Sequence, residues 1–162
     1  SNGASFYIKT AGAKVGARGD TAKNILFSEA AFYPNTEILN AEEIIEGSAQ
    51  QVPLDSGMIF IESTANGVGN YYQQTWELAT GGKSLYKPRF FSWRENPEYT
   101  EGYMLKKRGE FKTEAMFFQE YPDTPDQAFI LSGSHFFDKA TLFRMYNEAR
   151  EPIYAGDLLS YK

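Results

Sequence analysis

Two short polar segments follow apolar runs in this chain, and the first carries a carboxylate suited to phosphate chemistry. Ser28 and Glu29 come directly after the apolar residues 25–27. A carboxylate in this position can orient and deprotonate a water molecule that attacks a phosphate, and a neighbouring oxygen can contact Mg²⁺ or its water shell. Glu29 is therefore the candidate catalytic residue, and Ser28 is a candidate for a weak metal contact made through water. The alternative is that Glu29 is a surface or capping residue.

The second polar segment is Ser-Thr-Ala-Asn-Gly at residues 63–67, after the apolar run 58–61. Its two hydroxyls and its amide can hydrogen-bond a γ-phosphate, or they can cap a helix instead. Arg18 lies in a glycine-rich loop and could also meet a phosphate, although a solvated loop arginine is an equal alternative. The candidate nucleotide-binding residues are Ser63, Thr64, Ala65, Asn66, Gly67 and Arg18.

The elements that must position these residues alternate between strands and helices. The apolar runs at residues 24–27 and 58–61 lack polar alternation, which is typical of buried parallel strands. Each run is followed by a polar loop and a helical pattern, the second at residues 70–80. This order predicts an α/β fold with a partial, mainly parallel sheet flanked by helices, and a ligand site at the carboxyl ends of the strands. The first helix is expected to be capped by Thr36 or Asn40 and to end at Gly47.

Further elements are expected on both sides of this pattern. Residues 5–10 and 89–93 have the composition of short strands. Residues 98–119 form a helical region that Gly109 splits, and a final helix begins at Asp138. Between them, proline-spaced turns predict a small, mostly helical subdomain.

The composition is that of a folded domain without thiol chemistry. Hydrophobic residues make up 42% and charged residues 23% of the 162 residues, which argues against intrinsic disorder. The net charge of −5 argues against a protein that binds DNA with its whole surface, although a local basic patch remains possible. The absence of cysteine excludes disulfides and thiolate zinc sites. No apolar run approaches the ~20 residues that a membrane-spanning helix needs.

Two further features resemble active-site motifs but lack essential parts. Residues 82–84 have the sequence Gly-Lys-Ser, like the end of a P-loop, but Glu77 occupies the position of the first glycine. The segment is also expected to follow a helix, whereas a P-loop follows a strand. His135 is the only histidine, which argues against a histidine-dependent triad.

The motifs together resemble the large terminase subunit of tailed bacteriophages, over residues from about 5 to 160. Several linked motifs in the right order are much more specific than any one of them. The matching segments are Arg18-Gly19 and residues 25–35, 61–72, 90–93, 96–99, 118–122, 128–129 and 132–133.

The resemblance implies roles for individual residues. Ser28 and Glu29 match the Walker B pair, so Glu29 would be the catalytic carboxylate. Ser28 stands where the family more often has Asp, which leaves a weaker, neutral metal contact. Residues 63–65 match the motif that couples hydrolysis to movement. Arg18 matches an arginine that precedes Walker B in the family.

The resemblance also implies an ATP-driven motor that threads viral DNA into an empty capsid, in the cytoplasm of a bacterial host and outside the mature virion. Residues 1–119 would be the carboxyl-terminal part of a P-loop-type ATPase domain, and residues 120–162 a linker toward a nuclease domain. The P-loop is expected upstream of residue 1, so the chain alone should hold no nucleotide tightly and show negligible ATPase activity. The cofactors and partners implied for the full-length protein are ATP, Mg²⁺, double-stranded DNA, the portal protein, the small terminase subunit and further copies in a ring, with no membrane.

Two other functions fit the same residues. In the first, the chain is a non-catalytic interaction module in which Glu29 is a cap and an aromatic linker docks a partner such as a portal ring. In the second, it belongs to another nucleic-acid NTPase, such as a helicase core. A helicase core should carry further arginine-containing motifs downstream, and none is visible in this sequence. The ATPase interpretation requires Glu29 and Ser63 to lie at adjacent strand ends facing one open cleft.

Overall fold

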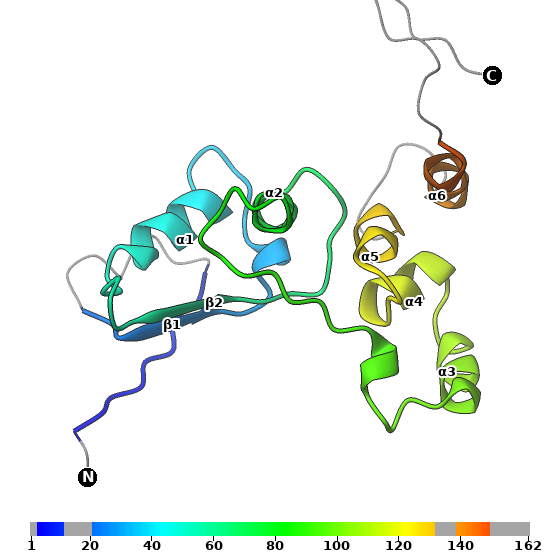
Figure 1. The fold of residues 1–162 in the computed structure, drawn as a ribbon, viewed down its shortest axis with the longest axis horizontal. Helices are drawn as coiled ribbons and strands as arrows, with labels where there is room; N and C mark the ends of the chain where they lie inside the picture. Colours follow the sequence, from blue (N-terminus) through cyan, green and yellow to red (C-terminus); the bar gives the residue numbers. More distant parts are fainter. Residues whose placement is uncertain (1–2, 12–20, 132–138, 150–162) are drawn as a thin grey trace, which may run out of the picture. The chain divides into compact units, whose positions relative to one another are not determined.

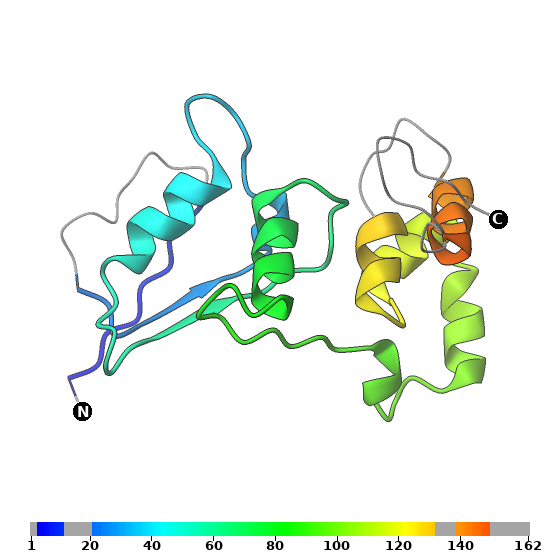
Figure 2. The same ribbon diagram turned by 45° about the horizontal axis from the view of Figure 1, so that its top comes forward.

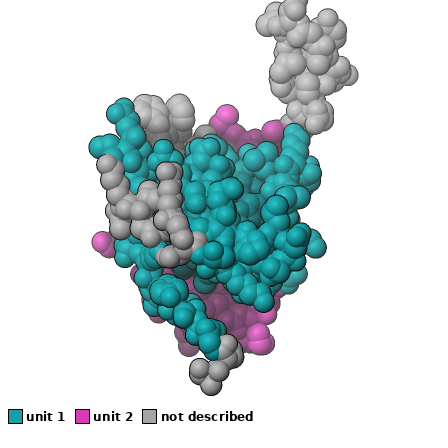
Figure 3. All heavy atoms as spheres, turned by 90° about the vertical axis from the view of Figure 1, so that its left-hand side faces the viewer, with its two compact units in different colours: residues 1–89 teal, residues 90–162 magenta. Residues whose placement is uncertain are grey.

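A computed structural model describes residues 3–11, 21–131 and 139–149 (Figure 1). The chain divides into two compact units, residues 1–89 and residues 90–162, which Figure 3 colours separately. No helix among the described residues is long and apolar enough to cross a membrane. The functional boundary after residue 119 stays a prediction.

The first unit contains a sheet of two parallel strands, β1 (Asn24–Phe27) and β2 (Met58–Ile61). The register pairs Asn24 with Met58 and Phe27 with Ile61. At the start of the ladder, the Asn24 side chain accepts a hydrogen bond from the Met58 backbone N–H at 3.0 Å. The α/β class and the parallel pairing are therefore confirmed.

Two helices, α1 (Ala41–Ala49) and α2 (Tyr71–Thr80), lie on the same side of this sheet (Figures 1 and 2). The core between the layers centres on Phe27, Ala30 and the fully buried Ile45. Ala30 belongs to a 3₁₀ turn, Ala30–Phe32, that follows β1. The remaining side chains packed against this core are Ile25, Tyr33, Ile59, Ile61, Tyr71 and Tyr72.

The opposite face of the sheet is apolar and open. Leu26, Met58 and Phe60 are 62%, 55% and 53% exposed. Parallel sheets normally have both faces covered, and for this reason their strands are apolar throughout. The prediction that β1 and β2 are buried strands is therefore wrong for one face of the sheet, because the described residues cover only the other face.

The helix starts agree with the sequence, but one helix end does not. Asn40 and Asn70 cap α1 and α2, since their side chains accept hydrogen bonds from the backbone N–H groups of Glu43 at 2.8 Å and Gln73 at 3.0 Å. The prediction that Gly47 ends the first helix is wrong, because α1 continues to Ala49. A glycine inside a helix costs only about 1 kcal/mol, and burial of Ile45, two residues earlier, offsets that cost.

Two predicted strands are not observed. Residues 5–10 form no strand, and Phe6, Tyr7 and Ile8 are exposed. Residues 89–92 form no strand, and Trp93–Glu95 is a 3₁₀ turn closed by a capping box between Ser92 and Glu95. Alternation and aromatic content show only that the side chains suit a strand. A strand also needs a neighbouring strand for backbone hydrogen bonds, and these patterns do not provide one.

The second unit is helical. The predicted split at Gly109 is confirmed, because α3 (Glu101–Arg108) ends there and α4 (Glu114–Glu120) follows. The chain continues with α5 (Pro125–Leu131) and α6 (Lys139–Glu148). Aromatic side chains cluster around α4, where the ring centroids of Phe111, Phe117 and Tyr121 lie within 6.0 Å of one another. Asp138, the predicted start of the last helix, and His135 lie outside the described residues.

Gly57, which precedes β2, gives a stability prediction. An added Cβ would lie 2.2 Å from Val52 Cγ1 and 2.6 Å from the Lys23 carbonyl oxygen. We expect Gly57→Ala to destabilise the first unit by about 1–3 kcal/mol, because backbone beside the sheet must shift. Urea unfolding measures the change. Gly47→Ala is the control, since an added Cβ there meets nothing within 4 Å and should be neutral or stabilising; equal losses would contradict the prediction.

Candidate active site

The carboxyl ends of β1 and β2 lie side by side, and both candidate segments begin there (Figure 2). The two segments stay joined after the last ladder pair. The Glu62 backbone N–H donates to the Phe27 carbonyl at 2.9 Å, and the Ala30 N–H donates to the Glu62 carbonyl at 3.1 Å. These hydrogen bonds therefore keep the two loops side by side beyond the ends of the strands.

Glu29 and Ser63 are in direct contact at this edge. The Ser63 hydroxyl donates to Glu29 Oε2 at 3.3 Å and accepts a hydrogen bond from the Ala31 backbone N–H at 3.1 Å. One hydroxyl thus touches both the candidate catalytic carboxylate and the turn that carries it. Glu29 is exposed and Ser63 is half-buried, so the second carboxylate oxygen is accessible to water.

The backbone of Glu29 adopts a conformation that is unfavourable for this residue type. Its φ of 55° and ψ of 41° lie in the left-handed region, and it is the only non-glycine residue with positive φ in the described part of the chain. Such a backbone conformation costs a residue with a Cβ about 1–2 kcal/mol. Strained residues of this kind concentrate at functional sites, where the surrounding structure holds them.

The other predicted site residues that the structure describes lie close to this contact. Ser28 is exposed, Thr64 is half-buried, and Ala65 and Gly67 are buried. The Asn66 side chain donates to the Ala31 carbonyl at 3.2 Å. Arg18 lies outside the described residues.

Tyr72 belongs to the site but is recognisable in the sequence only as a core position of a helix. Its hydroxyl donates to the Ser63 carbonyl at 3.3 Å. Burial raises the pKa of Tyr72 above its ordinary value, and the charges of Glu62 and Glu29 act in the same direction. The hydroxyl therefore keeps its proton and remains a donor to Ser63 at neutral pH.

Gln73 is a second residue that sequence patterns do not single out. It is a buried polar side chain, 7% exposed, that accepts a hydrogen bond from the Gly69 N–H at 3.0 Å and donates to Glu77. These contacts fix the loop that leads from the second candidate segment into α2. Its burial is visible only in the structure, where the amide is hydrogen-bonded as buried polar groups normally are.

The oxygen donors present suit a magnesium ion that is held mainly by water and phosphate. Ser28 and Glu29 offer one hydroxyl and one carboxylate at the strand end. Mg²⁺ usually keeps several waters and binds one or two carboxylates plus substrate phosphates. Within the described ranges, no group of three or more His, Cys, Asp or Glu side chains could hold a metal by itself.

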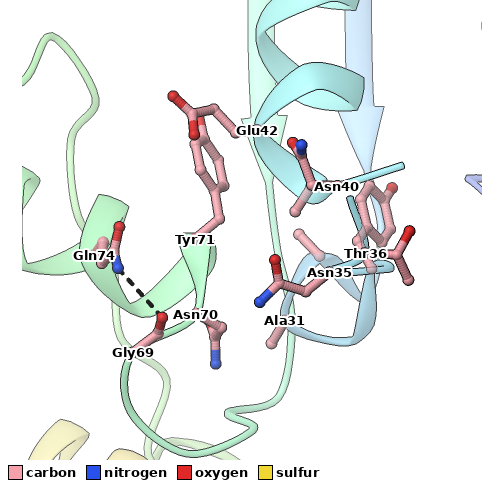
Figure 4. A pocket seen from close by; sticks show the side chains of 12 residues that line it. Ala31, Asn35, Thr36, Asn40, Glu42, Gly69, Asn70, Tyr71 and Gln74 are labelled. Atoms are coloured by element: carbon pink, nitrogen blue, oxygen red, sulfur yellow. Dashed lines mark hydrogen bonds between the residues drawn. The ribbon is translucent and has the colours of Figure 1, made fainter. Parts of the chain in front are cut away.

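A hollow of about 340 Å³ lies beside this contact, but neither Glu29 nor Ser63 lines it (Figure 4). The helix caps Asn40 and Asn70 both contribute to its wall. Several of its polar atoms are already used locally, including the Gln74 amide, which donates to the Gly69 carbonyl at 3.2 Å. The other lining residues are Ala30, Ala31, Tyr33, Asn35, Thr36, Ala41, Glu42 and Tyr71. The expected adjacency of Glu29 and Ser63 is observed. The expected cleft shared by the two side chains is not, because this hollow is the space between two helix starts and neither residue lines it.

Residues 82–84 do not form a P-loop. They follow α2, and the backbone N–H groups of Gly82 and Lys83 donate to the Ala79 and Leu78 carbonyls at 3.2 and 2.8 Å. Those N–H groups close the end of a helix, so they are not free to hold a phosphate. The prediction that this segment is not a phosphate site agrees with this geometry.

The structure thus brings Glu29, Ser63 and Asn66 together around the Ala31 peptide and adds Tyr72 to the group. Ser28 lies next to them in the chain. No protein-family model, curated protein or solved structure matches this chain.

Proposed function

We propose that this chain is the carboxyl-terminal part of the ATPase domain of a phage large terminase subunit, which drives viral DNA into a capsid. The observation that supports this proposal most is the hydrogen bond between Ser63 and Glu29 across the carboxyl ends of two parallel strands. Nucleotide sites of parallel α/β sheets lie at that edge. The second support is the resemblance of residues 25–35 and 61–72 to the family's motifs.

In the proposed reaction, Glu29 is the general base. A water molecule attacks the γ-phosphorus of ATP, its proton passes to the Glu29 carboxylate, and the bond to the bridging oxygen of ADP breaks. Ser63 holds Oε2 of Glu29, which leaves Oε1 to receive the proton. Bound Mg²⁺ would neutralise charge on the phosphates, with Ser28 as a contact through water.

The proposed assembly follows from the terminase assignment. ATP and Mg²⁺ are the cofactors, and the partners are double-stranded DNA, the portal protein, the small terminase subunit and further copies arranged in a ring. The site of action is the cytoplasm of a bacterial host. The Ser63–Gly67 turn senses the γ-phosphate and couples hydrolysis to movement.

The chain by itself is expected to turn over ATP at a rate indistinguishable from buffer. Phosphate positioning and charge stabilisation supply most of the rate acceleration in phosphoryl transfer, and the described residues contain no strand, P-loop and helix in succession. Phosphate release from the purified 162-residue chain, compared with the intact protein, measures this. Steady turnover by the chain alone that Glu29→Gln abolishes would refute the prediction. An intact protein that neither hydrolyses ATP nor contains a P-loop would refute the proposed function.

A non-catalytic interaction module is the second candidate. It is favoured by the open apolar face formed by Leu26, Met58 and Phe60, which suits contact with another polypeptide. The same assay separates the two candidates. An interaction module leaves the intact protein without ATP turnover, whereas the motor requires it.

A further inference from the structure

We propose that Asn66 is a positioning residue for Glu29 and acts through the peptide group of Ala31. This inference rests on the proposed function, since it assigns a role in the same ATPase site. The sequence pattern predicts a different role for Asn66, which is direct contact with the nucleotide. The geometry directs its amide nitrogen toward the turn that carries the catalytic carboxylate.

The Ala31 peptide is held on both sides by the loop after β2. Its N–H donates to the Ser63 hydroxyl at 3.1 Å, and its carbonyl accepts from Asn66 Nδ2 at 3.2 Å. Ala31 is only 5% exposed, so these bonds are shielded from competing water. A third bond, from the Ala30 N–H to the Glu62 carbonyl at 3.1 Å, holds the preceding residue.

The hydrogen bonds to the Ala31 peptide matter for Glu29 because the backbone conformation of Glu29 is strained. A residue in the left-handed region stays there only when its neighbours are fixed. Ser63 fixes the Glu29 carboxylate and one side of the Ala31 peptide, and Asn66 fixes the other side. Loss of the Asn66 donor would let the turn relax and carry the carboxylate away from the attacking water.

Asn66 is itself anchored to the start of α2. The Asn70 side chain, which caps that helix, donates to the Asn66 carbonyl at 3.0 Å and to the Gly67 carbonyl at 3.3 Å. The first turn of α2 is thus connected through Asn66 and Ala31 to Glu29. The connection runs through hydrogen bonds within one compact unit.

The test compares Asn66→Asp with Asn66→Gln in the intact protein. Asp keeps the size of the side chain but cannot donate to the Ala31 carbonyl, whereas Gln keeps an amide donor. We expect Asn66→Asp to lower kcat for ATP hydrolysis about 10- to 100-fold with KM changed less than about twofold, since small displacements of a reacting group cost this much. Asn66→Gln should keep the larger part of kcat.

Asn40→Asp is the matched control. It makes the same atomic change and adds the same charge, and its carboxylate still caps α1, so kcat should stay within about twofold of the parent. Amide hydrogen exchange gives a readout that does not depend on activity. In Asn66→Asp, exchange at residues 30–33 should accelerate while the β1 and β2 amides keep their protection.

The outcomes separate this inference from the proposed function. A parent protein without ATP turnover refutes the proposed function itself. With an active parent, an Asn66→Asp variant that retains kcat within twofold overturns the positioning role. General loss of protection in β1 and β2 also overturns it, because Asn66 would then support the fold as a whole. An equal loss of kcat in Asn66→Gln, with normal exchange at residues 30–33, overturns the assignment of the donor.

Discussion

Glu29→Gln in the intact protein is expected to lower kcat for ATP hydrolysis by at least about 100-fold, with little change in KM. A general base contributes about 10²–10⁴ to the rate, and an amide oxygen at the position of Oε1 or Oε2 cannot accept the proton from water. The amide oxygen of Gln can still accept the hydrogen bond from Ser63, so the turn should keep its structure. The loss should therefore be confined to the chemical step.

Steady-state phosphate release with saturating Mg²⁺-ATP measures this loss. Glu37→Gln is the matched control, because Glu37 is an exposed carboxylate in the loop before α1 and the substitution removes the same charge. The control should keep full activity. If Glu29→Gln retained more than about a tenth of kcat, Glu29 could not be the general base.

Ile45→Ala is expected to destabilise the first unit by about 2–5 kcal/mol, which makes it the largest stability effect we predict. Ile45 is 0% exposed and packs with Phe27 and Ala30, the last residue of β1 and the first of the turn after Glu29. Truncation leaves a cavity at the point where α1 rests on the sheet. The site should loosen with the core, because the same contacts support the turn that carries Glu29.

Urea unfolding, together with amide exchange in β1 and β2, measures the effect of this truncation. Ile38→Ala is the control, since Ile38 is 71% exposed and should change stability by less than about 0.5 kcal/mol. Similar losses for the two substitutions would contradict the packing described here. A loss limited to exchange in α1, with normal protection in both strands, would show that the helix is not required for the sheet.

The strands and helix starts were predictable because their signals are local. An apolar run without alternation identifies β1 and β2. A side-chain acceptor near the start of the helical pattern limits the cap of α1 to Thr36 or Asn40, and the structure uses Asn40. Residues 5–10 and 89–93 carry comparable strand signals but form no strand. A strand exists only with a neighbour, and side-chain pattern does not specify where that neighbour lies.

The identity of Glu29, Ser63 and Asn66 as a group was partly predictable, but their contacts were not. Polar residues after two parallel strands must meet at one edge, so their proximity follows from the chain order. The bonds themselves join residues 32 to 35 positions apart and depend on the register that pairs Phe27 with Ile61. A shift of that register by one residue would turn Ser63 away from Glu29, since successive side chains point to opposite faces. The left-handed turn at Glu29 and the two hydrogen bonds to the Ala31 peptide thus depend on long-range packing, which cannot be read from residue types and spacing along the chain.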